Sequence, residues 1–175
     1  DLHRLIRRQR QMCIRDSNYT ASTRLILKQC GLSDEDIDNR LIKVHGEASN
    51  NDIIFGVEDN AGIKKEHVFL RKAYNIKYKA LNFSELYDRI KSVAIFGHSL
   101  GETDHTYFNK LFQESCMYNK FSTNNNKEFW LFYYKENGYH CMMQQLDSLT
   151  HNSLTSFRQY NRVNFINTDK EKVFI

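Results

Sequence analysis

Short apolar runs alternate along this chain with longer segments whose apolar residues recur at helical spacing, a pattern typical of alternating strands and helices. The predicted strands cover residues 41–45, 52–57, 92–96, 128–134 and 163–166. The predicted helices cover residues 20–30, 32–40, 64–78, 83–91, 104–117 and 138–160. This order of elements predicts a three-layer α/β domain with a mostly parallel, Rossmann-like sheet, in which the very apolar run 128–134 is a buried central strand.

We interpret the first seventeen residues as a sequencing-adapter artefact and not as part of the fold. Residues 11–17, QMCIRDS, are what the end sequence of a transposase-type adapter encodes when it is read in frame. A targeting peptide is the rival interpretation because the segment is rich in Arg, but it lacks an apolar core and a small-residue cleavage site. On this interpretation the natural chain continues upstream of Asn18, and residues 1–17 are expected to pack loosely.

Removing this segment changes what the charge implies. The whole chain has 25 basic and 21 acidic side chains, a net of +4, and residues 1–17 contribute five Arg and two Asp, a net of +3. Residues 18–175 therefore carry only +1. A charge this small gives no reason to expect a nucleic-acid or membrane partner.

The 158 residues that remain are enough for one domain or most of one. No apolar run reaches the roughly 20 residues that span a bilayer. Three cysteines remain, Cys30, Cys116 and Cys141, without a C-x-x-C pair. An odd number of unpaired cysteines favours reduced thiols, a cytoplasmic location and no metal site.

Residues 92–108, SVAIFGHSLGETDHTYF, carry the strongest functional signal. An apolar strand ends at Gly97, a tight loop follows, and a helix begins near Asp104, which is the arrangement that places ligands at the carboxyl edge of an α/β sheet. Residues 97–101 match the nucleophile elbow G-x-S-x-G, with Ser99 as the nucleophile. The same loop also suits a nucleotide pocket, in which backbone N–H groups and the Ser99 hydroxyl hold ribose and phosphate.

The serine-hydrolase hypothesis requires an acid and then a histidine after the nucleophile, each at its own strand end. Asp169 follows the last predicted strand, but no histidine comes after it. Asp147 and His151 have the right order but share one predicted helix. The hydrolase stays the alternative, because the elbow is complete and His45-Gly46 is similar to an oxyanion-loop His-Gly.

Four motifs in sequence order resemble the bacteriophage abortive infection AbiH family. They are NYT at residues 18–20, VHGE at 44–47, DIIFGVED at 52–59 and FGHSLGETDHTYF at 96–108. The resemblance extends over nearly all of the chain after Ser17 and implies an anti-phage defence protein. Families of this kind begin with a Gly-rich strand–loop–helix of the form GNGFD, which this chain lacks, so residues 18–175 are expected to be the C-terminal part of an α/β domain that is incomplete at its N-terminus.

The same motifs are more distantly similar to the sirtuin-like NAD-binding fold, which implies NAD as the ligand. That likeness makes His45 a general base near the ribose hydroxyls, and Asn18 the residue that orients a ribose hydroxyl or the attacking water. The likeness places Ser99 against the ribose or the phosphates. We expect the two glycine loops to bind the cofactor through Gly46, Gly97, His98, Ser99 and Asp104. The sirtuin loop has Thr before its Ser, where this chain has His98.

Each of these assignments has a structural alternative. His45 could be a satisfied histidine at a strand end, Asp104 could cap the following helix, and His105 is expected to be a solvated helical side chain. Because Asn18, His45 and Ser99 each follow or end a predicted strand, we expect them to converge at the carboxyl edge of one parallel sheet. Without a catalytic base, the same pocket would be a nucleotide sensor that acts through a phage-derived trigger or partner protein.

Overall fold

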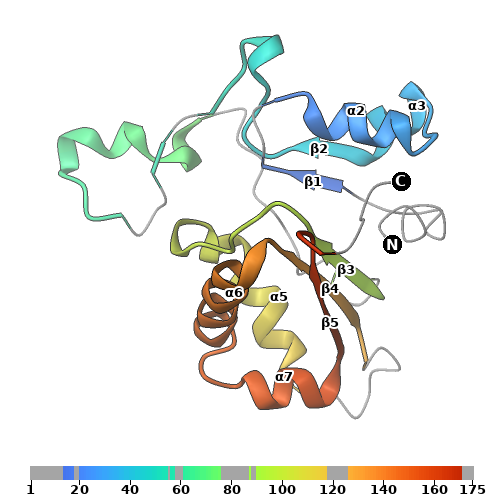
Figure 1. Cartoon of the computed structure of the whole chain (residues 1–175). Helices are drawn as coiled ribbons and strands as arrows, with labels where there is room; N and C mark the ends of the chain where they lie inside the picture. Colours follow the sequence, from blue (N-terminus) through green and yellow to red (C-terminus); the bar gives the residue numbers. More distant parts are fainter. Residues whose placement is uncertain are drawn as a thin grey trace. The chain divides into compact units, whose positions relative to one another are not determined.

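The computed structural model describes residues 14–17, 20–54, 56–57, 61–75, 87, 90–117 and 126–170 (Figure 1). The chain divides into two compact units. The first contains Asp1–Leu81 and Val173–Ile175, and the second contains Asn82–Lys172. Each unit has parallel strands and α-helices, which confirms the predicted parallel α/β class, but the strands form two small sheets where one was expected.

The sheet of the first unit pairs β1 (Ile14–Asp16) with β2 (Leu41–Lys43) in parallel. The expectation that residues 1–17 pack loosely is therefore wrong for β1, whose Asp16 is 7% exposed. The hydrogen bonds between β1 and β2 continue one residue beyond β2, where Val44 donates its N–H to the Asp16 carbonyl at 2.9 Å. The adapter origin of residues 1–17 stays a prediction.

Two short helices join these strands, as predicted: α2 (Ser22–Gln29) and α3 (Asp34–Arg40). The chain turns between them at Gly31, which has φ +86°, and α3 begins at Ser33, whose hydroxyl accepts the Asp36 N–H at 3.1 Å. Their apolar sides meet in a small core of Leu27, Cys30 and Ile37. This core contains fewer buried side chains than the core of the second unit.

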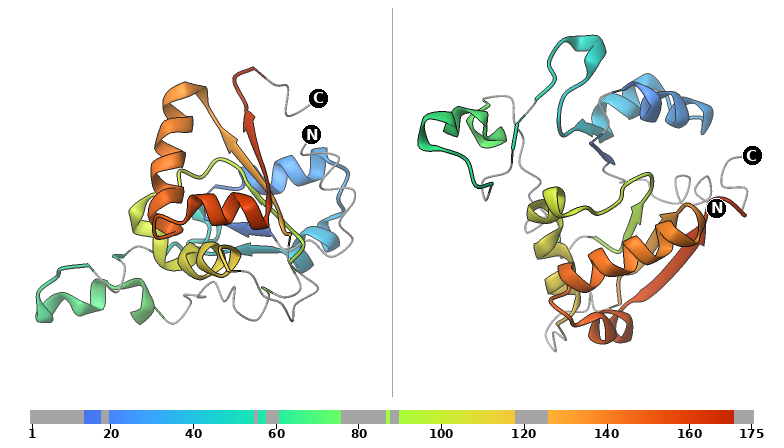
Figure 2. Two further views of the ribbon diagram at one scale, coloured as in Figure 1. Left: turned by 90° about the horizontal axis from the view of Figure 1, so that it is seen from below. Right: turned by 60° about the vertical axis from the view of Figure 1, so that its left-hand side comes forward.

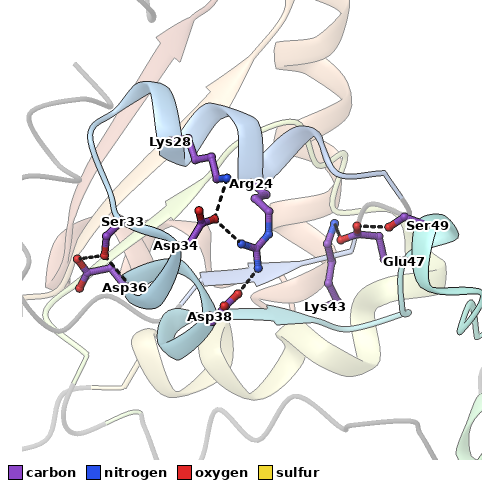
Figure 3. Close-up of polar contacts among 9 residues, drawn as sticks. All are labelled: Arg24, Lys28, Ser33, Asp34, Asp36, Asp38, Lys43, Glu47 and Ser49. Carbon is purple, nitrogen blue, oxygen red and sulfur yellow. Dashed lines mark hydrogen bonds and ion pairs between the residues drawn. The ribbon is translucent and has the colours of Figure 1, made fainter.

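An ion-pair network covers the outer side of α2 and α3 (Figure 3). Arg24 reaches both Asp34, at 3.0 Å, and Asp38, while Lys28 Nζ lies 2.8 Å from the same Asp34 carboxylate. The two cations lower the pKa of Asp34, with Lys28 the larger cause. Because these side chains are exposed, the pairs fix the helix–helix geometry more than they stabilise the fold.

The remaining described residues of the first unit form loops and three 3₁₀ turns: η1 (Ala48–Asn50), η2 (Lys65–Leu70) and η3 (Lys72–Tyr74). The predicted strand 52–57 is wrong, because in its described part only Val57 makes a β-bridge, to Arg71. The predicted helix 64–78 is also wrong over residues 64–75. Arg71 separates η2 from η3 with an extended backbone (φ −71°, ψ 135°), since it pairs with Val57.

The second unit contains a parallel sheet in the order β3–β4–β5, formed by Ser92–Ile95, Glu128–Tyr133 and Arg162–Asn167. The central position of β4 confirms the prediction made from its apolar run. Three helices, α5 (His105–Ser115), α6 (Lys135–Leu149) and α7 (Leu154–Tyr160), pack along one face of this sheet (Figures 1 and 2). A short 3₁₀ turn, η5 (Glu102–Asp104), leads into α5.

The core of the second unit lies between this sheet face and the helices. Alternate residues of β4, Phe129 and Leu131, are fully buried against Phe112 and Phe157 from α5 and α7 and against Leu146 from α6. The rings of Phe129 and Phe157 meet edge to face with centroids 4.8 Å apart. Full burial of a Leu or Phe side chain stabilises by about 1.5–3 kcal/mol, so this cluster outweighs the small core of the first unit.

One helix prediction in the second unit needs correction, and another falls almost entirely outside the described residues. The single helix expected over 138–160 is divided into α6, which begins at Lys135, and α7, which begins at Leu154. The helix breaks because His151 (φ +51°) and Asn152 (φ +60°) adopt left-handed conformations that an α-helix cannot contain. The helix predicted over 83–91 lies almost entirely outside the described residues. None of the helices that the structure describes has the length and apolar character needed to cross a bilayer.

Candidate functional site

The loop between β3 and α5 is bounded by two residues in the left-handed region, Gly97 (φ +67°) and Leu100 (φ +55°). No heavy atom lies within 4 Å of a Cβ built at Gly97, so backbone conformation alone favours glycine there. Leu100 adopts this unfavourable φ because its side chain is fully buried in the core beneath the loop. The loop is thus anchored at Leu100 and turns sharply on either side of Ser99.

The His98 side chain contacts both the backbone of this loop and the residue that precedes α5. Its Nδ1 accepts the Leu100 N–H at 2.9 Å, and its Nε2 lies 3.4 Å from Oδ2 of Asp104. Because Nδ1 accepts, the proton of the neutral ring lies on Nε2 and faces the carboxylate. The ring also packs edge to face against Phe108, with centroids 5.2 Å apart. His98 therefore connects the loop at Leu100 with the start of α5.

His105 holds the same loop from the helix side. Its Nε2 lies 3.0 Å from the Leu100 carbonyl and 2.8 Å from Oε1 of Gln145 on α6. The prediction of a solvated His105 is wrong, because the ring is half-buried between the loop and α6. Gln145 is a residue that sequence reasoning missed, and no local pattern could have found it, since the two residues are 40 positions apart.

Asp104 occupies the N-cap position of α5, but its side chain makes no capping hydrogen bond. The carboxylate faces His98 instead. The helix-cap interpretation is therefore wrong for this side chain. Whether Asp104 also contacts a ligand, as predicted, stays a prediction.

Ser99 is exposed at the tip of the loop, but its backbone is not that of a nucleophile elbow. In an elbow the nucleophile itself sits on a strained turn, and the N–H of the next residue helps to form the oxyanion hole. Here Leu100, not Ser99, has the positive φ, and the Leu100 N–H is already bonded to His98. The geometry therefore argues against the serine-hydrolase alternative.

The loop after β2 has a different construction. His45 is 4% exposed, and its carbonyl accepts the Ile54 N–H at 2.8 Å. Gly46 has φ +74°, and a Cβ there would lie 2.1 Å from the Asp52 carbonyl oxygen. The Asp52 carboxylate accepts the Glu47 N–H at 2.7 Å. Residues 52–54 thus close this loop over Gly46, which explains why they do not form the predicted strand.

A lysine that sequence reasoning missed ties this loop to β1. Lys43 Nζ lies 3.4 Å from Glu47 Oε2 (Figure 3). The same ammonium lies 2.7 Å from Asp16 Oδ2 and donates to the Thr20 carbonyl. A hydrogen bond from Ser49 and the charge of Lys43 lower the pKa of Glu47. The ammonium therefore links the end of β1, the start of α2 and the His45 loop.

The predicted site residues fall into separate groups. Gly97, His98, Ser99 and Asp104 lie together in the β3–α5 loop of the second unit, whereas His45 and Gly46 belong to the first unit. Asn18 lies outside the described residues, and the convergence of Asn18, His45 and Ser99 stays a prediction. In the part of the chain that the structure describes, no three His, Cys, Asp or Glu side chains are grouped to hold a metal ion.

These features define a class: a parallel α/β protein with a rigid glycine-bounded loop at the carboxyl end of a strand. The chain belongs to the bacteriophage abortive infection AbiH family, whose match covers residues 3–134 and includes both glycine loops. This confirms the family resemblance and places the protein in anti-phage defence by abortive infection. No curated protein and no solved structure matches the chain.

Proposed function

We propose that this abortive-infection protein binds a nicotinamide-type dinucleotide such as NAD through the β3–α5 loop, and that it cleaves the N-glycosidic bond of the ligand. The observation that supports the binding step is the construction of the loop. His98 and His105 hold its backbone from the inside, and the Ser99 hydroxyl is left exposed at the carboxyl end of a parallel strand. Open α/β sheets bind nucleotides at this edge.

In this proposal Ser99 bonds a ribose hydroxyl or a phosphate oxygen, and Gly97 allows the backbone to approach the ligand closely. His98 and Asp104 act as positioning residues, because their mutual contact orients the loop. A loop held in this way loses little entropy when a ligand binds, which favours affinity.

The bond-breaking step requires a general base for water. A water molecule adds to the anomeric carbon of the nicotinamide ribose through an oxocarbenium-like state, the carbon–nitrogen bond breaks, and nicotinamide leaves as a neutral base. The products are nicotinamide, ADP-ribose and the proton that the base removes from water. We assign that base to His45, since imidazole exchanges protons near cellular pH. Asn18 is proposed to orient the attacking water.

The binding step is tested by calorimetric titration of the purified protein with NAD, using Ser99→Ala and, as a matched control, Ser148→Ala, an exposed serine on α6. Loss of one ligand hydrogen bond is expected to weaken binding about 5- to 30-fold in Ser99→Ala, and the control should bind normally. Equal affinity in both variants would remove Ser99 from the site.

The catalytic step is tested by following nicotinamide release chromatographically, with and without phage components. We expect release by the wild type and none by His45→Ala. Because His45 is buried, His45→Gln and a thermal melt of each variant separate lost chemistry from lost folding. NAD binding without turnover, unaffected by His45→Ala, would identify a sensor. Ester hydrolysis that Ser99→Ala abolishes, with NAD untouched, would identify a serine hydrolase.

A further inference from the structure

Residues 61–81 form a strongly basic segment, although the chain as a whole is nearly neutral. Residues 61–81 hold six Lys or Arg and a single acidic residue, Glu66, a net of +5. Residues 18–60 hold four basic and eight acidic side chains, a net of −4, and residues 82–175 hold ten of each. The small net charge of the chain is therefore the sum of an acidic and a strongly basic part.

The described part of this segment, residues 61–75 (green in Figure 1), also exposes large apolar side chains. Phe69 is 64% exposed, Leu70 45% and Tyr74 65%. Lys64 and Lys65 are exposed next to them. Exposed aromatic rings interleaved with cations are a combination that binds single-stranded nucleic acid, because bases stack on the rings while Lys and Arg contact the phosphates. We name residues 61–75 the basic arm; it holds four of the six basic side chains and Glu66, a net of +3.

The base of the arm is held firmly. Val57 donates its N–H to the Leu70 carbonyl at 2.9 Å and accepts the Lys72 N–H at 2.9 Å. A Cβ at Gly56 would lie 2.5 Å from the Leu70 carbonyl oxygen, so this close approach requires glycine. Gly56 and Val57 of the DIIFGVED motif therefore hold the backbone of the basic arm in place. These contacts hold the backbone of residues 70–72 between the two exposed rings, and a backbone that is already ordered loses less entropy on binding.

The shape of the arm disfavours a membrane surface. In a 3₁₀ helix, side chains three positions apart share a face, so Phe69 is in line with Glu66 and Leu70 with His67. The apolar side chains therefore form no continuous apolar face, which an interfacial helix needs. Stacking on separate rings has no such requirement.

From the charge and the exposed rings we infer that the basic arm binds single-stranded nucleic acid. This reverses the expectation of no nucleic-acid partner, which rested on net charge alone. The arm is separate from the β3–α5 loop in sequence and in compact unit. Failure of this inference would therefore leave the proposed dinucleotide site untouched.

The test is fluorescence anisotropy of labelled oligo(dT) and oligo(U) of about 15 nucleotides, the upper range of a single-module site. Tyr74→Ala is expected to weaken binding of both about 5- to 150-fold, the effect of losing one stacked base. Its matched control is Tyr134→Ala, in which a ring of similar exposure (58%) is removed from the second unit. The control should bind like the wild type.

A second pair of variants tests the interaction with phosphates. Lys64→Gln/Lys65→Gln should lower the slope of log affinity against log salt by about 0.7 for each phosphate that the protein no longer neutralises. Lys110→Gln/Lys170→Gln, which removes two exposed lysines elsewhere, should leave the slope unchanged. Affinities that are equal in test and control variants would overturn the inference. Binding to phosphatidylserine vesicles with no binding to either oligonucleotide would also overturn it.

Discussion

The loop after β2 and the loop after β3 both contain a glycine with positive φ, but they are held by different kinds of contact. Around Gly46 the chain packs against itself, with Asp52 so close that no side chain fits. Around Gly97 there is open space, and the loop is shaped instead by the side chains of His98 and His105. The first loop depends on backbone packing, and the second on two imidazole rings.

This difference bears on what each loop can do. A loop closed by backbone contacts keeps its histidine buried, as His45 is, and presents few groups to a ligand. A loop braced from the inside by side chains leaves its tip exposed, as at Ser99. For this reason the β3–α5 loop is the part of the molecule that we propose for ligand recognition.

The largest expected effect comes from alanine at the two glycines. Gly46→Ala should destabilise by about 3 kcal/mol or more, because the new Cβ adds a steric clash to the unfavourable φ. Gly97→Ala should cost only about 1–2 kcal/mol, the penalty of a left-handed non-glycine residue. Urea denaturation followed by circular dichroism measures both. Equal losses of stability would contradict the proposed difference between the loops.

An effect smaller than that of Gly46→Ala is expected from the histidine that shapes the β3–α5 loop. His98→Ala leaves the Leu100 N–H without its acceptor and should cost about 1–2 kcal/mol. His98→Asn should recover most of that loss, because an Asn side chain can accept the N–H two residues on. Thermal denaturation and hydrogen exchange of the Leu100 amide report the change. His140→Ala, at an exposed position on α6, should have no effect, and failure of Asn to rescue would show that ring packing matters more than the hydrogen bond.

The smallest effect concerns pH and the β2 loop. Ser49 and Lys43 lower the pKa of Glu47, so its carboxylate stabilises the folded protein above the unfolded-state pKa. That contribution is lost as the pH falls through the folded-state pKa. The difference in melting temperature between wild type and Glu47→Gln should therefore be present at pH 7 and shrink in acid. Glu136→Gln, at a largely exposed position, should show no such trend, and a pH-independent difference for Glu47→Gln would count against the ion pair.

Much of the secondary structure was predictable because it depends on local patterns. The Ser33 cap, the helix α5 and the apolar strand β4 all follow from neighbouring residues in sequence. The run 52–57 was misassigned because it has the composition of a strand but serves to close the His45 loop. The break between α6 and α7 was missed because no Gly or Pro marks it.

The candidate site was predictable only in part. The four motifs indicated the AbiH family, and the position of Ser99 after an apolar strand indicated the loop. The ring contacts of His98 and His105 were not predictable, because they depend on Leu100 adopting a left-handed conformation above the core. Net charge did not indicate the basic arm, since a sum over the chain conceals a locally basic segment.

The sequence by itself determined the family, the parallel α/β class and the loop that carries Ser99. Only the tertiary structure decided which side chains hold that loop, that Lys43 joins β1 to the His45 loop, and that Gly56 braces the basic arm. The physical reason is the range of the interactions. Helix periodicity, strand alternation and capping act between residues a few positions apart, whereas the Gln145–His105 contact joins segments that meet only after the core has packed.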